Sequence, residues 1–94
     1  MKGSLKMKLN DKFLIHDTGS GEILVPVGEE SKSFHGIIKL NETGSVIVHL
    51  LEKDDLSLQE ILEYFYEHYE CDESIKGDIE LFINKLKEVN AIEY

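Results

Sequence analysis

The hydrophobic pattern of this chain changes its period within one stretch, residues 34–44, which reads FHGIIKLNETG. The first half alternates as a β-strand does, with Phe34, Gly36, Ile38 and Leu40 on one face and His35, Ile37 and Lys39 on the other. After Leu40, apolar residues recur at helical spacing. Asn41 suits the helix N-cap, because its side-chain oxygen can accept a hydrogen bond from an amide two or three residues later. The stretch therefore predicts a strand that leads directly into a helix.

Two more strands are predicted before this stretch, at residues 13–16 and 23–27, and the turn-forming residues 18–21 join them. Pro26 has no N–H for a ladder hydrogen bond, so the second strand is expected to end or to bulge there. The third strand is expected to extend from Ser33 to Leu40. Because the connections are short, the three strands should form an antiparallel meander.

Three helices are predicted after the strands, the first over residues 42–53. Ser57 and Glu60 then form the S-x-x-E pattern of a capping box, which begins the second helix. Asp72 is the N-cap candidate of the third helix, which is expected to end at Asn90 in a left-handed conformation before residues 91–92 fold back. The order βββααα predicts an α+β, winged-helix-like fold, because one small sheet must bury its apolar face against the helices.

The length of 94 residues predicts a single domain over residues 1–94. Two interpretations of residues 1–10 stay open: a disordered lead-in, or an extension ahead of an alternative start at Met7. The chain shows neither the apolar segment of a signal peptide nor a run long enough to span a membrane. A single cysteine, Cys71, cannot form an internal disulfide, so we expect a cytoplasmic location.

The charge of the chain is strongly negative, with a formal net charge of −9 from 10 Lys+Arg and 19 Asp+Glu. Nucleic-acid binding needs a basic patch, and the anionic surface of a membrane repels an acidic chain. We therefore expect neither nucleic acid nor membrane as a partner. A basic peptide or a basic protein surface is electrostatically favoured.

No catalytic or metal-binding set is visible in the sequence. The four histidines lie on four different predicted elements, and His68 with Cys71 forms only an H-x-x-C fragment. A zinc site needs about four ligands. Acidic residues flank Cys71 and disfavour a reactive thiolate. We expect no metal, no cofactor and no enzymatic activity.

The third strand offers a different kind of site. In a three-stranded meander it is an edge strand, and the stretch from Phe34 to Ile38 has neither the proline nor the charges that usually protect an edge. Such an edge can accept an extended peptide as a further strand. Equally, a terminus, the third helix or a second copy of the chain can cover it, and both interpretations stay open. Leu81 lies between charged residues on a flank of the third helix, either as one wall of a peptide groove or as a lone exposed leucine.

Several of these residues together resemble the PqqD family, also known as the RiPP recognition element, where RiPP means a ribosomally made and post-translationally modified peptide. The resemblance covers about residues 13–92. Its strongest block is L-N-E-T-G at residues 40–44, with apolar Ile47 and the pair Leu50-Leu51. It continues in V-P-V-G at residues 25–28, in the capping box, in F-x-x-x-L at residues 82–86 and in N-A-I at residues 90–92. The chain departs from the family at Ile47, often an aromatic residue, and at Asn90, usually glycine.

The resemblance implies a non-catalytic adaptor in the biosynthesis of pyrroloquinoline quinone (PQQ) or of another such peptide product. It implies that the leader of a precursor peptide docks as an antiparallel strand on the third strand, against the third helix, for presentation to a radical SAM enzyme. The residues carried over as peptide-binding are Ser33, Phe34, His35, Gly36, Ile37, Ile38, Lys39, Asp78, Leu81, Phe82 and Lys85. Two alternatives are kept: a winged-helix DNA-binding regulator, which the charge opposes, and a homodimeric subunit that pairs through the same edge. The sequence leaves the chain either a monomer or a homodimer.

Overall fold

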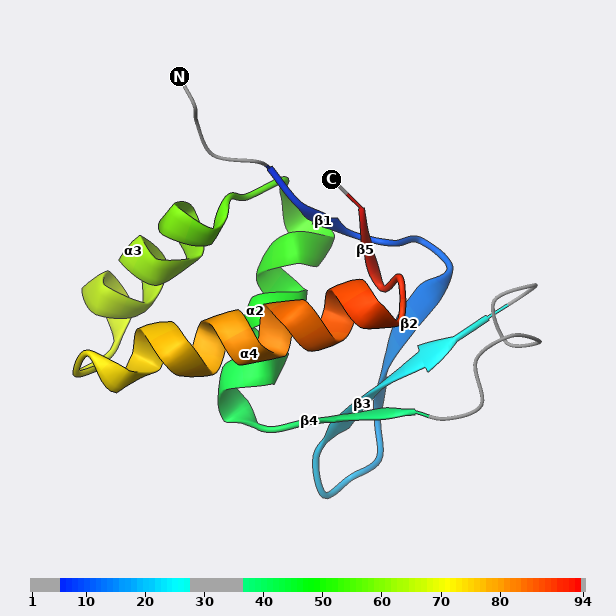
Figure 1. Cartoon of the computed structure of the whole chain (residues 1–94). Coiled ribbons are helices and arrows are strands. Elements are labelled where there is room, and N and C mark those ends of the chain that lie inside the picture. Colours follow the sequence, from blue (N-terminus) through cyan, green and yellow to red (C-terminus); the bar gives the residue numbers. More distant parts are fainter. Residues whose placement is uncertain (1–5, 28–36, 94) are drawn as a thin grey trace.

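Three antiparallel strands and three helices follow one another in the predicted order, and two short terminal strands are added to them (Figure 1). The computed structural model describes residues 6–27 and 37–93. The elements are β1 (Lys8–Leu9), β2 (Phe13–Asp17), β3 (Glu22–Pro26), β4 (Ile38–Leu40), α2 (Glu42–Lys53), α3 (Leu58–His68), α4 (Ser74–Glu88) and β5 (Ile92–Glu93). The α+β fold class predicted from the sequence is confirmed.

The main sheet has the order β2-β3-β4, and both strand pairs are antiparallel, as in a meander. A turn joins β2 to β3, in which Gly19 takes a positive φ of 92° that favours glycine. Pro26 is the last residue of β3, which confirms that the strand ends there. Of the strand predicted from Ser33 to Leu40, residues 33–36 lie outside the described residues, and β4 comprises Ile38–Leu40.

The passage from β4 to α2 follows the sequence prediction closely. Ile38 and Leu40 are buried while Lys39 between them is exposed, so the strand presents one face to the core. The side chain of Asn41 accepts a hydrogen bond of 2.7 Å from the amide of Gly44, which makes it the N-cap of α2. The helix begins at Glu42 because this cap satisfies one of its free amides.

The other two helices begin by different local means. Ser57 and Glu60 form a complete capping box at the start of α3. At α4 the prediction of Asp72 as the N-cap is shifted by one residue: the cap position is Glu73, whose side chain makes no capping bond. Asp72 instead accepts hydrogen bonds from the backbone and the hydroxyl of Ser74, two residues later, as in an Asx turn.

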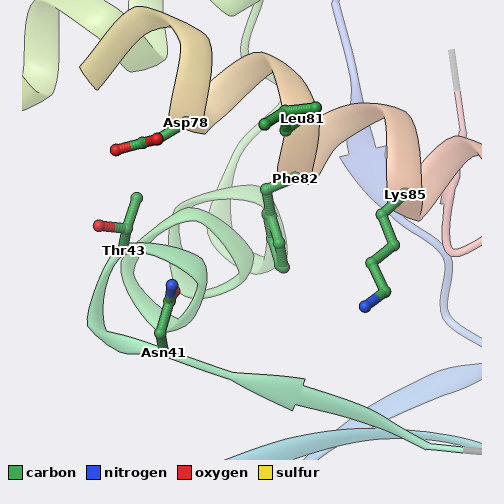
Figure 2. A pocket seen from close by; sticks show the side chains of 6 residues that line it. All are labelled: Asn41, Thr43, Asp78, Leu81, Phe82 and Lys85. Atoms are coloured by element: carbon green, nitrogen blue, oxygen red, sulfur yellow. The ribbon is translucent and has the colours of Figure 1, made fainter. Parts of the chain in front are cut away.

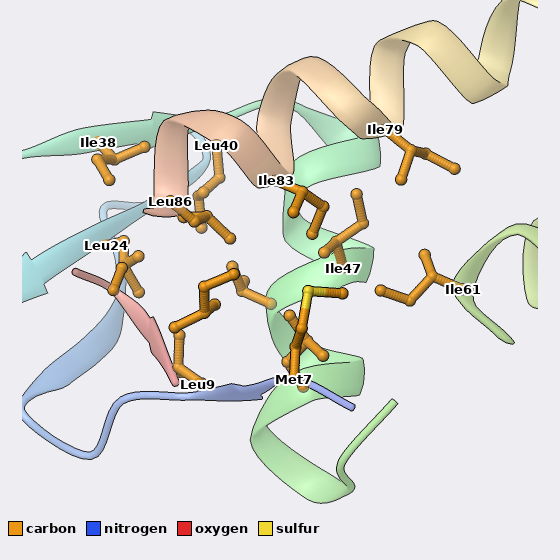
Figure 3. Packing of buried hydrophobic residues seen from close by; sticks show 14 of the residues in the cluster. Met7, Leu9, Leu24, Ile38, Leu40, Ile47, Ile61, Ile79, Ile83 and Leu86 are labelled. Carbon is orange, nitrogen blue, oxygen red and sulfur yellow. The ribbon is translucent and has the colours of Figure 1, made fainter. Parts of the chain in front are cut away.

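One hydrophobic cluster joins the helices to the sheet and to the N-terminal segment, as Figure 3 shows. Its largest contributions come from the inner faces of the three helices: Ile47, Val48 and Leu51 of α2, Ile61, Leu62 and Phe65 of α3, and Ile79, Ile83 and Leu86 of α4. Each fully buried aliphatic side chain of this size contributes about 1.5–3 kcal/mol. The core therefore fixes α4 across α2, beside the end of β4 (Figure 1).

The chain ends form a second sheet that the sequence did not predict. β1 and β5 pair antiparallel, with Lys8 opposite Glu93 and Leu9 opposite Ile92. Asn90 has a φ of 61°, the left-handed conformation expected of it, and turns the chain back after α4. Met7 and Leu9 are buried in the core, which makes β1 and the residue before it part of the fold.

Candidate functional site

Hydrogen-bonded and non-hydrogen-bonded residue pairs alternate along the main sheet, and this alternation, or phase, decides which backbone N–H and C=O groups of β4 face outward. Val27 donates to the carbonyl of Lys12, and Thr18 donates to that of Gly21, both at 2.8 Å. These bonds mark hydrogen-bonded pairs of β2 and β3 in the observed register, and such pairs alternate along an antiparallel ladder. The odd-numbered residues of β3 therefore direct their backbone groups toward β2. Glu22 and Leu24 direct theirs toward β4.

It follows that the groups at the open side of β4 belong to Lys39. Leu24 is paired with Ile38 and Glu22 with Leu40, so Ile38 and Leu40 use their N–H and C=O groups toward β3. Lys39 lies in the other phase and directs its N–H and C=O groups away from the sheet. Within the described ranges, no strand is paired with this side of β4. An extended chain can add there.

A pocket of about 360 Å³ lies beside the end of this strand, between the start of α2 and the middle of α4 (Figure 2). Its lining residues are Asn41, Thr43, Asp78, Leu81, Phe82 and Lys85. Four of them are the α4 residues that the family resemblance assigned to peptide binding. Phe82 points from α4 toward α2, and Lys85 extends toward β4. The pocket thus adjoins the open side of the sheet.

The shape of this pocket depends on the absence of a side chain at Gly44. A Cβ atom at this position would lie 3.0 Å from Cε1 and Cζ of Phe82 and 3.2 Å from Oδ1 of Asn41. The Phe82 ring therefore packs directly on the first turn of α2. The L-N-E-T-G block at residues 40–44 therefore supplies the N-cap of α2, the pocket-lining Thr43 and, at Gly44, the space for the Phe82 ring.

The exposure of the α4 residues suits recognition of an extended chain. Leu81 is 72% exposed, the highest value among the exposed large apolar side chains of the described residues. Phe82 is half-buried beside it, and Asp78 and Lys85 are exposed and of opposite charge. The pocket therefore offers an apolar centre with one acidic and one basic neighbour. Ser33, Phe34, His35 and Gly36 lie outside the described residues, while Ile37 is exposed just before β4.

The sequence reasoning did not assign Asn41, Thr43 and Gly44 to the site. The signal was present in the L-N-E-T-G block, which served only as a helix start and as a family marker. What it lacked was the position of α4, because only the packing of Phe82 on Gly44 brings this block into the pocket wall.

A hydrogen bond joins Glu22, the first residue of β3, to His49 of α2. Glu22 is paired with Leu40 in the sheet, and both oxygens of its carboxylate lie 3.0 Å from Nε2 of His49 on α2. The hydrogen bond with His49 is the largest cause that lowers the pKa of Glu22 below its ordinary value of 4.5, and Ser45 adds to it. Because Glu22 is paired with Leu40 in the sheet, this contact also helps to hold the end of β4 beside the pocket.

Metal-ligating side chains do not cluster within the same described ranges. No group of three or more His, Cys, Asp and Glu residues is arranged to hold a metal ion there. None of the helices is long and apolar enough to cross a membrane.

The family PqqD, described as coenzyme PQQ synthesis protein D, matches residues 21–92. No curated protein and no solved structure matches the chain significantly. The matched range runs from the start of β3 to β5 and includes every residue of the pocket. The chain therefore belongs to the PqqD family, the family of RiPP recognition elements.

Proposed function

We propose that this protein binds the leader of a ribosomally made precursor peptide as an added antiparallel strand on β4. It then presents the peptide to a modifying enzyme of the radical SAM type and carries out no chemistry itself. Its family consists of non-catalytic accessory proteins of PQQ and related peptide biosynthesis. The finer assignments to leader, strand and enzyme are our proposal.

The observation that carries the proposal is the juxtaposition of an open strand side with the α4 pocket. The backbone groups of Lys39 point outward, and the pocket lined by Leu81 and Phe82 lies next to the same strand end. Main-chain hydrogen bonds supply affinity in this mode of recognition, while pockets for alternate side chains supply specificity. Ile38 and Leu40 face the core, so alternate side chains of an added strand would face α4.

The two alternatives lead to different expectations. A DNA-binding regulator would need cationic contacts with phosphates, and the net charge of −9 opposes them. A homodimer would use the same open side of β4 for a second copy. Light scattering over a concentration series distinguishes this case, because the mass would rise with concentration in the absence of any peptide.

The direct test uses synthetic leaders of short precursor peptides encoded beside the gene. Titration of a leader into isotope-labelled protein should shift the amide signal of Lys39 and slow its exchange with solvent. Lys39→Pro removes the outward N–H and should weaken binding about 10–100-fold, because a hydrogen bond and the close approach of the peptide are both lost. Lys39→Ala is the matched control, since it keeps the amide and removes only the side chain.

The outcomes separate the proposal from its alternatives. Binding that leaves the amide of Lys39 unchanged would rule out strand addition on β4. Equal affinities of the proline and alanine variants would do the same. Retained helical circular dichroism in Lys39→Pro shows that a loss of binding does not come from unfolding.

A further inference from the structure

A second and larger pocket lies on the other side of Thr43. Its volume is about 620 Å³, and it lies where the first turns of α2 meet the end of α3 and the start of α4. Thr43 lines both this pocket and the one beside β4. A peptide that leaves the strand site past Asn41 and Thr43 would therefore enter it. The PqqD match and the proposed strand site leave this pocket without a role.

The chemistry of the pocket combines an apolar floor with an acidic rim. Phe65 is buried at 3% exposure, and Val46 is partly buried against the core. Glu42 and Glu70 line the same pocket. Neither carboxylate forms an ion pair or a hydrogen bond within the described part of the chain. Tyr69, 48% exposed, adds an aromatic ring to the rim.

The charge balance around this pocket favours a cation. Among the described residues, no lysine or arginine lines it. The amino ends of α2 and α4 lie nearby, and each contributes a partial positive charge of about half a unit. The carboxyl end of α3 contributes a partial charge of the opposite sign. The two full negative charges of Glu42 and Glu70 exceed the net partial positive charge that the three helix ends contribute together.

We infer that this pocket accepts a basic side chain, arginine or lysine, of the bound peptide. The aliphatic stem of such a residue would lie on Val46 and Phe65, and its charged head would lie between Glu42 and Glu70 beside the ring of Tyr69. The inference rests on the proposed peptide binding. Because the added strand is antiparallel to β4, which runs toward Asn41, the basic residue belongs to the segment on the amino-terminal side of the added strand.

The pocket itself can be tested without any leader peptide. Cys71 also lines it and is the only cysteine of the chain, so the rate of its alkylation by iodoacetamide reports on access to the pocket. The probe is N-acetyl-arginine amide, and the controls are the corresponding leucine and glutamate amides. Near-saturating arginine amide should slow the alkylation at least twofold and shift the amide signals of residues 42–46 and 69–71. Neither control should do so.

A matched pair of variants separates this site from general attraction to an acidic protein. Glu42→Gln with Glu70→Gln should abolish the protection by arginine amide. Glu67→Gln with Glu88→Gln removes the same charge from exposed positions outside the pocket and should preserve it. Equal protection of both double variants, or none in the unaltered protein, would overturn the inference.

A final measurement links the pocket to the peptide. In a leader that shifts the amide of Lys39, each basic residue on the amino-terminal side of the protected segment is replaced by alanine. One replacement should weaken binding about tenfold, which corresponds to 1.4 kcal/mol, and should restore the alkylation rate of Cys71. If every replacement leaves both values unchanged, this inference is wrong while strand addition stands. If no leader shifts Lys39, the proposed function fails, and the arginine amide result still decides the chemistry of the pocket.

Discussion

Two short strands of this protein, β1 and β4, differ in the hydrogen bonding along their two edges. On one side β1 pairs with β5, and on the other side Met7, directly before the strand, exchanges two hydrogen bonds with Leu56. β4 pairs only with β3 within the described ranges. Both strands contribute buried residues to one core, so burial does not explain the difference. β5, near the carboxyl end of the chain, pairs with β1, whereas the open side of β4 borders a pocket.

This contrast distinguishes a strand that is held on both sides near the core from one whose outer side has no paired strand among the described residues. At β1, Lys8 and Leu9 pair with Glu93 and Ile92, and the side chains of Leu9 and Ile92 add buried apolar surface. At β4, the buried residues hold the strand in place while the outward groups of Lys39 stay available. The predictions that follow test this division, from the largest expected effect to the smallest.

The largest effect is expected from Leu9→Ala in β1. Leu9 is 8% exposed, and its truncation should lower the free energy of unfolding by about 2–5 kcal/mol through lost burial and a cavity. Urea denaturation followed by circular dichroism measures this change. Leu14→Ala on β2 is the control, because Leu14 is 54% exposed, and it should cost about 0.5 kcal/mol or less. Equal effects would show that β1 is not an integral part of the fold.

A matched pair of proline substitutions compares the two strands directly. Asn10 donates to Ala91, so by alternation the N–H of Lys8 faces β5, whereas that of Lys39 faces outward. Lys8→Pro should cost about 2 kcal/mol, because it removes a ladder bond and leaves an acceptor unpaired. Lys39→Pro should cost less than about 1 kcal/mol, because an edge position without a ladder bond tolerates proline. The reverse order of stabilities in urea would contradict the phase assigned to β4.

A smaller effect is expected where the pocket meets α2. Gly44→Ala should lower stability by about 1 kcal/mol, because the crowding of Phe82 costs about 1–3 kcal/mol and alanine returns up to about 1 kcal/mol of helix propensity. Phe82→Leu removes the ring atoms that the new methyl group would meet. In that background Gly44→Ala should be neutral or stabilising, as a double-mutant cycle would show. Identical effects in both backgrounds would mean that the packing of the Phe82 ring does not depend on a glycine at position 44.

The smallest effect is expected from pH. It concerns two carboxylates, one hydrogen-bonded near β1 and one near the end of β4. Glu60 accepts a 2.6 Å bond from Lys6 ahead of β1, and Glu22 of β3, the sheet partner of Leu40, is hydrogen-bonded to His49. These contacts lower the pKa of each carboxyl below 4.5 in the folded protein. Stability from such a group is complete above its unfolded pKa and is lost as the pH falls through the folded pKa.

Thermal unfolding between pH 6 and pH 3 tests this expectation, with a fall in stability beginning below about pH 4.5. Glu60→Gln and Glu22→Gln should each flatten the fall slightly, because each removes one group that must be protonated. An unchanged profile in both variants would mean that other carboxylates cause the acid response.

Much of the fold could be predicted because its determinants are local. The N-cap at Asn41, the capping box of Ser57 and Glu60, and the strand end at Pro26 each depend on residues within a few positions. The left-handed Asn90 belongs to the same class. The N-cap of α4 was predicted at Asp72, one position before the observed cap position Glu73, because Asp72 bonds to Ser74 in an Asx turn ahead of the helix.

The β1–β5 pair could not be predicted in the same way. Its two-residue strands carry no periodic signal, and their partners lie more than 80 positions apart in the chain. Of the site, the sequence provided the exposed flank of α4 with Leu81 and the edge strand. It did not provide Thr43 or the second pocket, because both depend on how α2, α3 and α4 pack.

The sequence by itself determined the order of the main strands and helices, the caps of α2 and α3, the end of β3, and that the chain is acidic. Caps, turns and hydrophobic periodicity act over a few residues, so they can be recognised without the fold. Only the tertiary structure decided that the outward backbone groups of β4 belong to Lys39, that Phe82 packs on Gly44, and that β5 pairs with β1. These features depend on register and packing between distant segments, and no local pattern specifies them.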